Sequence, residues 1–373
     1  ERSVLAPPPA RLELALPPPG PQAGRSLSVF HWIASENRGI TIEAFVVRLQ
    51  VLLLSILVLS CVAFGDVSLA SELWIGTGTV SITPDKPVAL AGQTVTRIAR
   101  EVSGPCMATA VAIESRQDNK TLDYAILVSC DLIGIRGFEG RLRERVAKRL
   151  PDLDVKKVLL NATHTHTAPV LQEGKYDIPP DAMRATEYIE FLVDRVCDLV
   201  VKTWQSRRPG GGVSWGLGHA VVGNHRRMVY ADGSAVMYGK TNIDTFRRVE
   251  GREDHGVEVL FFWDKNKRLL AVAVNVACPS QEVGMGKAVS ADFWHEVRLG
   301  LRKKYGKNVQ VLAWTGASGD QSPKLLWRTE AEERMRKGRG LTRLEEIARR
   351  IVHAVDEAHE VAKKDIRFTN VPL

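Results

Sequence analysis

The sequence predicts a single large α/β domain in which mixed β-sheets are flanked by helices. Three kinds of pattern predict it: short apolar runs typical of strands, polar turns that join such runs into hairpins, and amphipathic stretches typical of helices. The chain has 373 residues, of which 45% are hydrophobic and 25% charged. This is ordinary globular composition, and residues 73–373 are long enough to bury a sizeable core.

Two hairpins are expected. The apolar runs 108–115 and 122–130 surround a polar turn at Gln117 to Lys120, and the runs 257–263 and 269–276 surround the sequence DKNK. Two further apolar segments, 155–165 and 308–316, predict buried strands.

Four segments predict helices. One face of residues 182–204 is apolar at helical spacing, and Pro151 ends the helix expected just before it in the chain. Ser290 is the expected N-cap of the third helix, and Gly338 and Gly340 interrupt the fourth. The expected helices are 138–150, 182–204, 290–306 and 328–362. The final residues, 365–373, resemble the start of a strand.

The N-terminal part differs in composition. Residues 1–48 are Pro-rich and predict disorder or a mis-called start. The apolar run after Arg48 is of signal-peptide length, so residues 49–70 predict an export signal cleaved near Ala70. A lipoprotein signal anchored through Cys61 and a buried core helix are the alternatives. The expected location is therefore periplasmic, extracellular or lipid-anchored to a membrane.

Charge and missing motifs exclude several classes. The net charge is +8, which suits an anionic membrane surface, and no arginine-rich run with interleaved aromatic residues indicates nucleic acid. The five cysteines contain no CxxC and are too few for a disulfide framework. No GxSxG, GxGxxG or Walker loop is present, which weighs against α/β-hydrolases, dinucleotide enzymes and P-loop NTPases.

The sequence LLNATHTHTAP, residues 159–169, is the first candidate site. If the segment is extended, His164 and His166 share one face at the end of a strand, and neutral imidazole is a common zinc ligand. Nearby polar groups, Asn161 and the threonines at 163, 165 and 167, are candidates to orient the rings. The alternative is a polar strand end with two solvated histidines, because HxH alone is not specific.

Three other motifs carry polar groups at strand ends. Residues 314–327 hold Asp320 and Ser322 in a Gly-rich turn, where an ordinary loop is the alternative. The sequence NHRR brings Arg226 and Arg227, which suit a carbonyl or an anionic headgroup, unless this is a solvated hairpin end. Cys278 follows an apolar strand and is otherwise an inert core residue.

Taken in order, these motifs resemble the neutral/alkaline non-lysosomal ceramidase family, specifically its N-terminal catalytic domain. The likeness runs from about Trp74 to Trp327. The pieces that carry it are IGTGTVSITP, ATHTHTAP for the family's ATHTHSGP, NHRR for its Asn-Arg-Arg segment and GDQSP for its GDVSP.

The resemblance implies a zinc amidase that cleaves an N-acyl sphingosine into a fatty acid and sphingosine. It implies His164 as a zinc ligand, His166 beside the metal, Arg226 in contact with substrate and Ser322 as the active-site serine. Arg227 and Asp320, in the same motifs, are expected to bind substrate. Zinc would acidify its bound water, and a histidine would move the proton.

This sequence departs from the family in two ways. The family's second zinc histidine falls at Ala277 or Cys278, where no histidine stands, so Cys278 as a thiolate or His295 is the candidate replacement. The remaining family ligands, a Glu and a Tyr, are expected beyond Leu373, so the domain 73–373 is expected to be incomplete at its C-terminus.

Three functions therefore follow as hypotheses. The first is an exported zinc amidase that acts on a lipid or another N-acyl amide. The second is a secreted binding protein that keeps the fold without a complete zinc site. The third is a metal-independent serine hydrolase that uses Ser322, for which the sequence identifies no general base.

Overall fold

The computed structural model describes residues 71–369, which form one α/β domain with a mixed eight-stranded sheet and five flanking helices. The predicted fold class is confirmed. The Pro-rich segment 1–48 and the predicted signal 49–70, with Cys61, lie outside the described residues. None of the helices in the described part of the chain combines the length and the apolarity needed to cross a bilayer.

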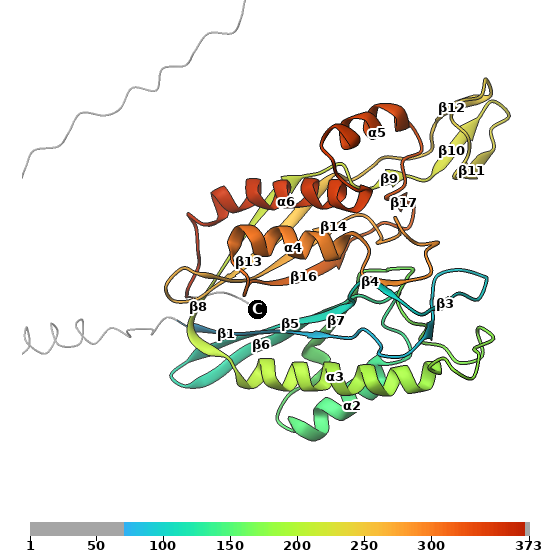
Figure 1. Ribbon diagram of the computed structural model, residues 1–373. Helices are drawn as coiled ribbons and strands as arrows, with labels where there is room; N and C mark the ends of the chain where they lie inside the picture. Colours follow the sequence, from blue (N-terminus) through green and yellow to red (C-terminus); the bar gives the residue numbers. More distant parts are fainter. Residues whose placement is uncertain (1–70, 370–373) are drawn as a thin grey trace, which may run out of the picture. The chain divides into compact units, whose positions relative to one another are not determined.

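The large sheet has the strand order β16-β14-β13-β8-β1-β5-β6-β7 (Figure 1). Its neighbours are antiparallel except for two parallel pairs, β6–β7 and β14–β16. The strands are β1 (Glu72–Ser81), β5 (Met107–Gln117), β6 (Lys120–Cys130), β7 (Val158–Ala162), β8 (Arg208–His219), β13 (Gly256–Trp263), β14 (Leu269–Val276) and β16 (Gln310–Thr315).

The helices cover the sheet on two sides. In Figure 1, α2 and α3 lie against the half of the sheet formed by β1, β5, β6 and β7, and α4 and α6 lie against the other half. The helices are α2 (Glu139–Arg149), α3 (Ala185–Gln205), α4 (Phe293–Tyr305), α5 (Thr329–Gly338) and α6 (Arg343–Ala362), and a 3₁₀ turn, η1, spans Val155–Lys157.

The two halves of the sheet face one another, so the domain has four layers in the order helix, sheet, sheet, helix. A separate apolar cluster fills the space between the sheet layers, with Ile75 and Val111 from one half and Phe262 and Leu312 from the other. Each helical layer has its own cluster against its own half of the sheet. The link between the halves is short, because β1 pairs with β8 at only three positions and with a register shift.

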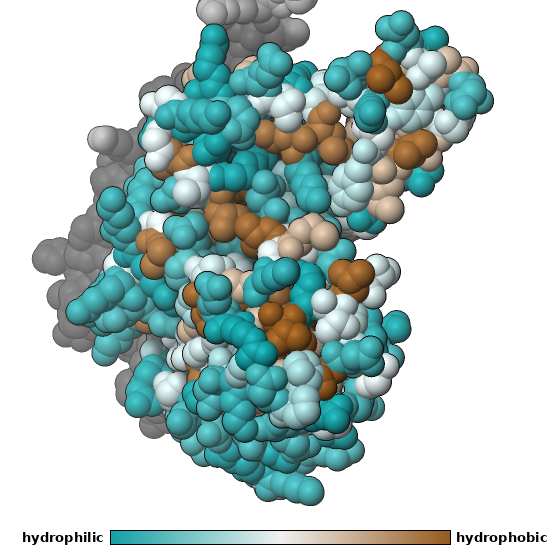
Figure 2. Space-filling model, turned by 45° about the vertical axis from the view of Figure 1, so that its right-hand side comes forward, coloured by the Kyte–Doolittle hydropathy of each residue, from teal (hydrophilic) through white to brown (hydrophobic). Residues whose placement is uncertain are grey.

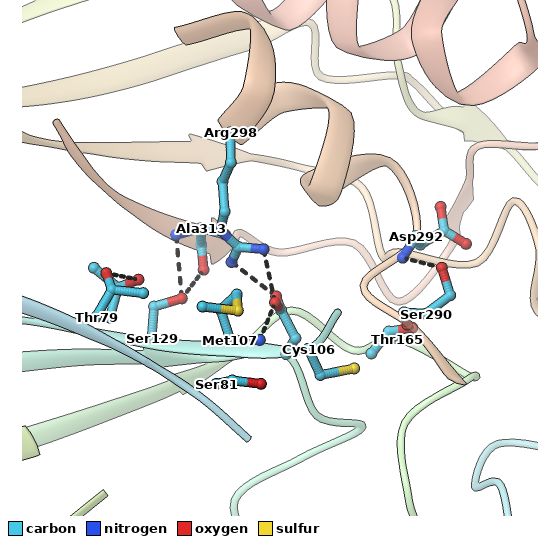
Figure 3. A network of polar contacts seen from close by, with 12 residues as sticks. Thr79, Ser81, Cys106, Met107, Ser129, Thr165, Ser290, Asp292, Arg298 and Ala313 are labelled. Carbon is cyan, nitrogen blue, oxygen red and sulfur yellow. Dashed lines mark hydrogen bonds and ion pairs between the residues drawn. The ribbon is translucent and has the colours of Figure 1, made fainter. Parts of the chain in front are cut away.

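A buried polar network also joins the layers (Figure 3). Arg298 on α4 donates two hydrogen bonds to Asp131, at the end of β6, at 2.7 and 2.9 Å. The same carboxylate accepts the backbone N–H of Met107, and the Ser129 hydroxyl donates to the Ala313 carbonyl of β16 at 2.6 Å. These bonds satisfy groups that burial would otherwise leave unpaired.

Short strand pairs build the end of the domain where the candidate motifs meet. A three-stranded sheet, β11-β10-β12, forms a lobe beside it (Figure 1). Its strands are β10 (Arg227–Tyr230), β11 (Ala235–Met237) and β12 (Phe246–Val249). The two-stranded pairs are β2 (Val88–Ala89) with β3 (Ile98–Ala99), β4 (Val102–Gly104) with β15 (Val289–Ser290), and β9 (Asn224–His225) with β17 (Gln321–Ser322).

Both predicted hairpins are confirmed, as β5–β6 and β13–β14. Asp118 and Asn119 have positive φ values of 51° and 62°, as a two-residue turn matched to strand twist requires. Each predicted helix also forms, and the predicted interruption near Gly338 and Gly340 separates α5 from α6.

Two local predictions are wrong. Asp292, not Ser290, is the N-cap of α4, and its carboxylate accepts the N–H of Phe293. The strand predicted over 155–165 begins with η1 and ends at Ala162, because the backbone turns into the left-handed region at His164. Of the C-terminal strand expected at 365–373, the described residues form only isolated bridges, at Arg367 and Thr369.

Candidate functional site

The segment after β7 alternates between the protein interior and its surface. Thr163, Thr165 and Thr167 are buried, whereas His164 is exposed and His166 is half-buried. The hydroxyls of Thr165 and Thr167 each donate to the Ser290 carbonyl at 2.9 Å. The two threonines therefore bind the segment to β15, rather than orienting the rings directly, and the histidines face the other way.

His164 has a backbone φ of 59°, which is uncommon for a residue with a side chain and is found disproportionately at functional sites. Its Nδ1 lies 2.7 Å from the Ile133 carbonyl oxygen. A carbonyl only accepts, so Nδ1 carries the proton and Nε2 of the neutral ring has a free lone pair. Metal-binding histidines are commonly oriented by such a bond from the second ring nitrogen.

The ring of His166 lies beside that of His164, with centroids 5.2 Å apart and planes at 66°. Its Nε2 lies 2.9 Å from the amide nitrogen of Gln281. That nitrogen only donates, so Nε2 accepts and the proton of the neutral ring is on Nδ1. Burial, and next the neighbouring His164, lower the pKa of His166 to about 4, so this ring is neutral at pH 7.

Glycines make room for the His166 ring. A Cβ atom on Gly92 would lie 2.3 Å from Cγ of His166, and the φ of +94° at this glycine disfavours any other residue. Gly284 lies on another side, where a Cβ atom would be 3.3 Å from the His166 Cβ. The backbone therefore closes on the imidazole from two sides and limits its rotation.

Arg97 holds the walls around His166 together. Its buried guanidinium donates to four backbone carbonyls, at distances between 2.5 and 3.0 Å. These carbonyls belong to Ala91, His166, Gly284 and Gly286. Desolvation lowers the pKa of Arg97. No sequence motif indicates Arg97 or Gln281.

Two cavities meet at the histidines. His164 lines one of about 440 Å³, the His164 cavity, and His166 lines a second of about 280 Å³, the His166 cavity. Arg226 and Gln281 line both, so the cavities adjoin. In Figure 2, which brings this end of the molecule forward, hydrophobic residues lie among hydrophilic ones on the lobe and below it.

Arg226 is the cation at this junction. Its backbone is fixed by hydrogen bonds to the Asp320 carbonyl and from the Tyr238 N–H. Within residues 71–369, no carboxylate lies within ion-pair distance of its guanidinium, whose one protein partner there is the Gly319 carbonyl. The side chain is therefore free to bind an oxygen atom in either cavity.

Asn161 lines the His164 cavity, but three other predicted site residues, Ser322, Arg227 and Asp320, line neither cavity. Ser322 is fully buried in β17, where its hydroxyl accepts a hydrogen bond from the N–H of Lys324. Arg227 forms a bidentate ion pair with Glu250 on the lobe. The carboxylate of Asp320 lies 3.2 Å from the ring of His225.

Cys278 lies in the core rather than at the site. Its side chain is fully buried, in the same apolar cluster as Val276 and Trp294. Burial raises the pKa of the thiol well above its usual value, which disfavours the thiolate that binds zinc. His295, the other candidate replacement, belongs to the first turn of α4 and lines neither cavity.

The donor set does not fit a complete zinc site. A catalytic zinc takes three protein ligands and keeps one open position. Nε2 of His164 is suited to such a role, but no group of three His, Cys, Asp or Glu residues between 71 and 369 is arranged to hold a metal. The described residues therefore supply part of a zinc site at most.

Comparison with solved structures finds proteins of similar fold. The chain is similar to neutral ceramidase from Pseudomonas aeruginosa, with a TM-score of 0.60 and 16% identity over 79% of this chain and 46% of that one. The chain has a ceramidase-like fold. A structure titled as ceramidase complexed with C2 gives a TM-score of 0.58 and 15% identity, over 79% of this chain and 45% of its own.

The chain thus spans slightly less than half the length of these ceramidases. No protein-family model matches the sequence, and no curated protein matches it. At this identity the similarity concerns the fold alone. A ceramidase-like activity of this chain is therefore a proposal.

Proposed function

We propose that this protein is an exported amide hydrolase that cleaves the N-acyl bond of a ceramide-like lipid. The observation that carries the proposal is the junction of two cavities at His164, His166 and an unpaired Arg226, in a domain with a ceramidase-like fold. The apolar segment 49–64 after Arg48 supports export, and the net charge of +8 supports an anionic membrane surface as the place of action.

The residues present account for parts of the reaction. Arg226 would donate to the carbonyl oxygen of the amide and stabilise the negative charge that forms on it when water adds to the carbon. The C–N bond then breaks, and the proton removed from the water passes to the leaving amine nitrogen. His166 is neutral at pH 7, so its Nε2 could take the proton of the water if the hydrogen bond from Gln281 is released.

In this proposal His164 is the residue that would bind zinc. Its Nε2 is free, because its Nδ1 is hydrogen-bonded to a backbone carbonyl. When bound, zinc would supply an acidified water molecule. Because the described residues do not complete the ligand set, no step above passes through the metal.

A second candidate function is non-catalytic binding of the same class of lipid. Two observations favour it: no three-ligand cluster exists among the described residues, and Cys278, one of the two positions where the family's second zinc histidine falls, is buried in the core. A metal-independent reaction through Ser322 has less support, because that hydroxyl is fully buried and lines neither cavity.

The test uses the full chain and an N-acyl sphingosine with a short, fluorescent acyl chain. Chromatography measures release of the acid, and fluorescence polarisation measures binding. Release of the acid that is lost in Arg226→Ala and kept in Arg227→Gln supports hydrolysis. Binding without release supports the second function, and neither binding nor release overturns both.

A further inference from the structure

A third cavity, of about 370 Å³, lies away from the histidines, between α5, α6 and the end of β8. In Figure 1, α5 lies beside the N-terminal end of α6. Four arginines line it, and we call it the arginine cavity: Arg328, Arg339, Arg349 and Arg350. None of its lining residues lines the His164 or the His166 cavity, so it is a separate site.

Two carboxylates oppose the four guanidinium groups. Glu346 is buried and accepts hydrogen bonds from Arg349 at 2.8 Å and from Arg350 at 2.9 Å. The hydrogen bond from Arg349 is the largest cause that lowers the pKa of Glu346 to about 2, so this group is ionised. Glu332 on α5 forms an ion pair with Arg350. Four guanidinium groups against two carboxylates leave the wall with an excess of two positive charges.

Arg328 contributes one of these excess positive charges. Within the described residues its guanidinium has no carboxylate partner and stacks on Trp327, 4.1 Å from the ring centroid. Its backbone φ of 57° is left-handed, which costs energy in a residue with a side chain. A network that served only to hold α5 on α6 would not need this unpaired charge, since the pair between Glu332 on α5 and Arg350 on α6 already joins the two helices.

The cavity is not polar throughout. Val221 is 45% exposed and Met335 is 50% exposed, and both line it beside the arginines. A compact dianion suits the two excess charges, because planar guanidinium groups bind phosphate oxygens in pairs. The apolar part of the wall suits a ligand with a carbon chain as well as an anionic head.

We propose that the arginine cavity binds a phosphate monoester through its dianionic phosphate group. Arg328 and the outward faces of Arg339 and Arg349 bind the oxygens, while Val221 and Met335 contact the carbon part of the ester. Inorganic phosphate offers the same head without the apolar contact, so it binds the same residues more weakly.

The experiment measures binding of inorganic phosphate and of butyl phosphate to the full chain by titration calorimetry, with sodium chloride at matched ionic strength as the blank. The key variant is Arg328→Asn, because asparagine tolerates a left-handed backbone and no described ion pair is broken. Loss of one charge-assisted contact should weaken binding about tenfold or more. Arg334→Gln on the same helix, outside the cavity wall, is the control and should bind as the parent does.

Each outcome of this experiment either supports or overturns the proposed phosphate monoester site. Butyl phosphate binding more tightly than phosphate, and weakened only by Arg328→Asn, supports the monoester site. Equal affinity for butyl phosphate and inorganic phosphate supports binding of the phosphate group and overturns the proposed contact of Val221 and Met335 with the carbon chain. Heat no greater than that of chloride, or identical binding in Arg328→Asn, overturns the site. Thermal unfolding of both variants, within a degree or two of the parent, shows that they fold.

Discussion

The guanidinium of Arg298 donates two hydrogen bonds to the carboxylate of Asp131, and both side chains are almost completely buried. Arg298 comes from α4, which covers one half of the sheet (Figure 3). Asp131 directly follows β6, a strand of the other half. The pair lies between the layers, and its two residues are 167 positions apart in the sequence. It fixes the layers to one another at the end of the domain that carries the histidines.

Removing one member of this pair should destabilise the domain strongly. In Asp131→Asn the buried guanidinium of Arg298 loses its carboxylate partner, and such losses cost about 3–5 kcal/mol. Urea unfolding followed by circular dichroism measures the change in free energy. The control is Glu187→Gln, which breaks the exposed pair with Lys86 and should change little. Equal effects of the two substitutions would refute the importance of burial.

Zinc bound by the full chain should depend on His164. His164→Ala removes an imidazole whose Nε2 is left free because Nδ1 donates to the Ile133 carbonyl, so zinc content by elemental analysis should fall. The control His295→Ala leaves the cavities intact and should keep the metal. If zinc falls in His295→Ala and not in His164→Ala, the ligand assignment is wrong.

Cys278 provides a second control for the metal. Cys278→Ser should keep whatever zinc the parent holds, because the thiol is buried among apolar side chains. It should also lower the free energy of unfolding by about 1–3 kcal/mol, since a hydroxyl replaces a nearly apolar group in the core. Loss of zinc with unchanged stability would instead identify Cys278 as a ligand.

Arg226 and its sequence neighbour Arg227 should differ sharply in their effect on turnover. Arg226→Ala removes the unpaired cation at the junction of the cavities, and loss of one oxyanion donor lowers kcat by about 10²–10³-fold. Arg227→Gln breaks only the pair with Glu250 and should keep kcat and KM. Steady-state kinetics on the labelled lipid measures both, and similar losses in the two variants would exclude a specific role for Arg226.

His166 should make the domain less stable in mild acid. Its pKa is about 4 in the folded chain, against 6.5 for an exposed histidine, so the unfolded chain binds more protons between these values. This contribution to stability is therefore lost as the pH falls from about 6.5 to about 4. His166→Gln removes it, so the stability of this variant should fall less over that range. Parallel urea titrations at pH 7 and pH 4.5 compare the two proteins, and equal losses would contradict the assignment.

Local patterns predicted most elements of the fold. The hairpins and helices follow from periodicity and turn residues that lie within a few positions of one another, such as Asp118 and Asn119. The folding of the sheet into two facing layers depends on contacts between distant strands, as between Ser129 and Ala313. No short-range pattern contains that information.

The candidate site was predictable only in part. The sequence His164-Thr165-His166 predicted two histidines on one side of a strand end. The structure brings their rings together, although the strand ends before them. Arg97 and Gln281 could not be found in this way. Most of their partners lie far along the chain, 69 residues away for the His166 carbonyl at Arg97 and 115 for the ring of His166 at Gln281. The four groups that Arg97 binds are backbone carbonyls, which carry no residue-specific signal.

The short junction between β1 and β8 has a consequence for how the domain forms. Each half of the sheet with its helices is an almost continuous stretch of chain, 72–205 for one and 208–362 for the other. Most contacts within a half are therefore closer in sequence than contacts between halves, and closing them costs less chain entropy. We expect each half to acquire structure as a cooperative unit before the two dock. The histidine cavities draw on both halves, so they are completed only in that last step.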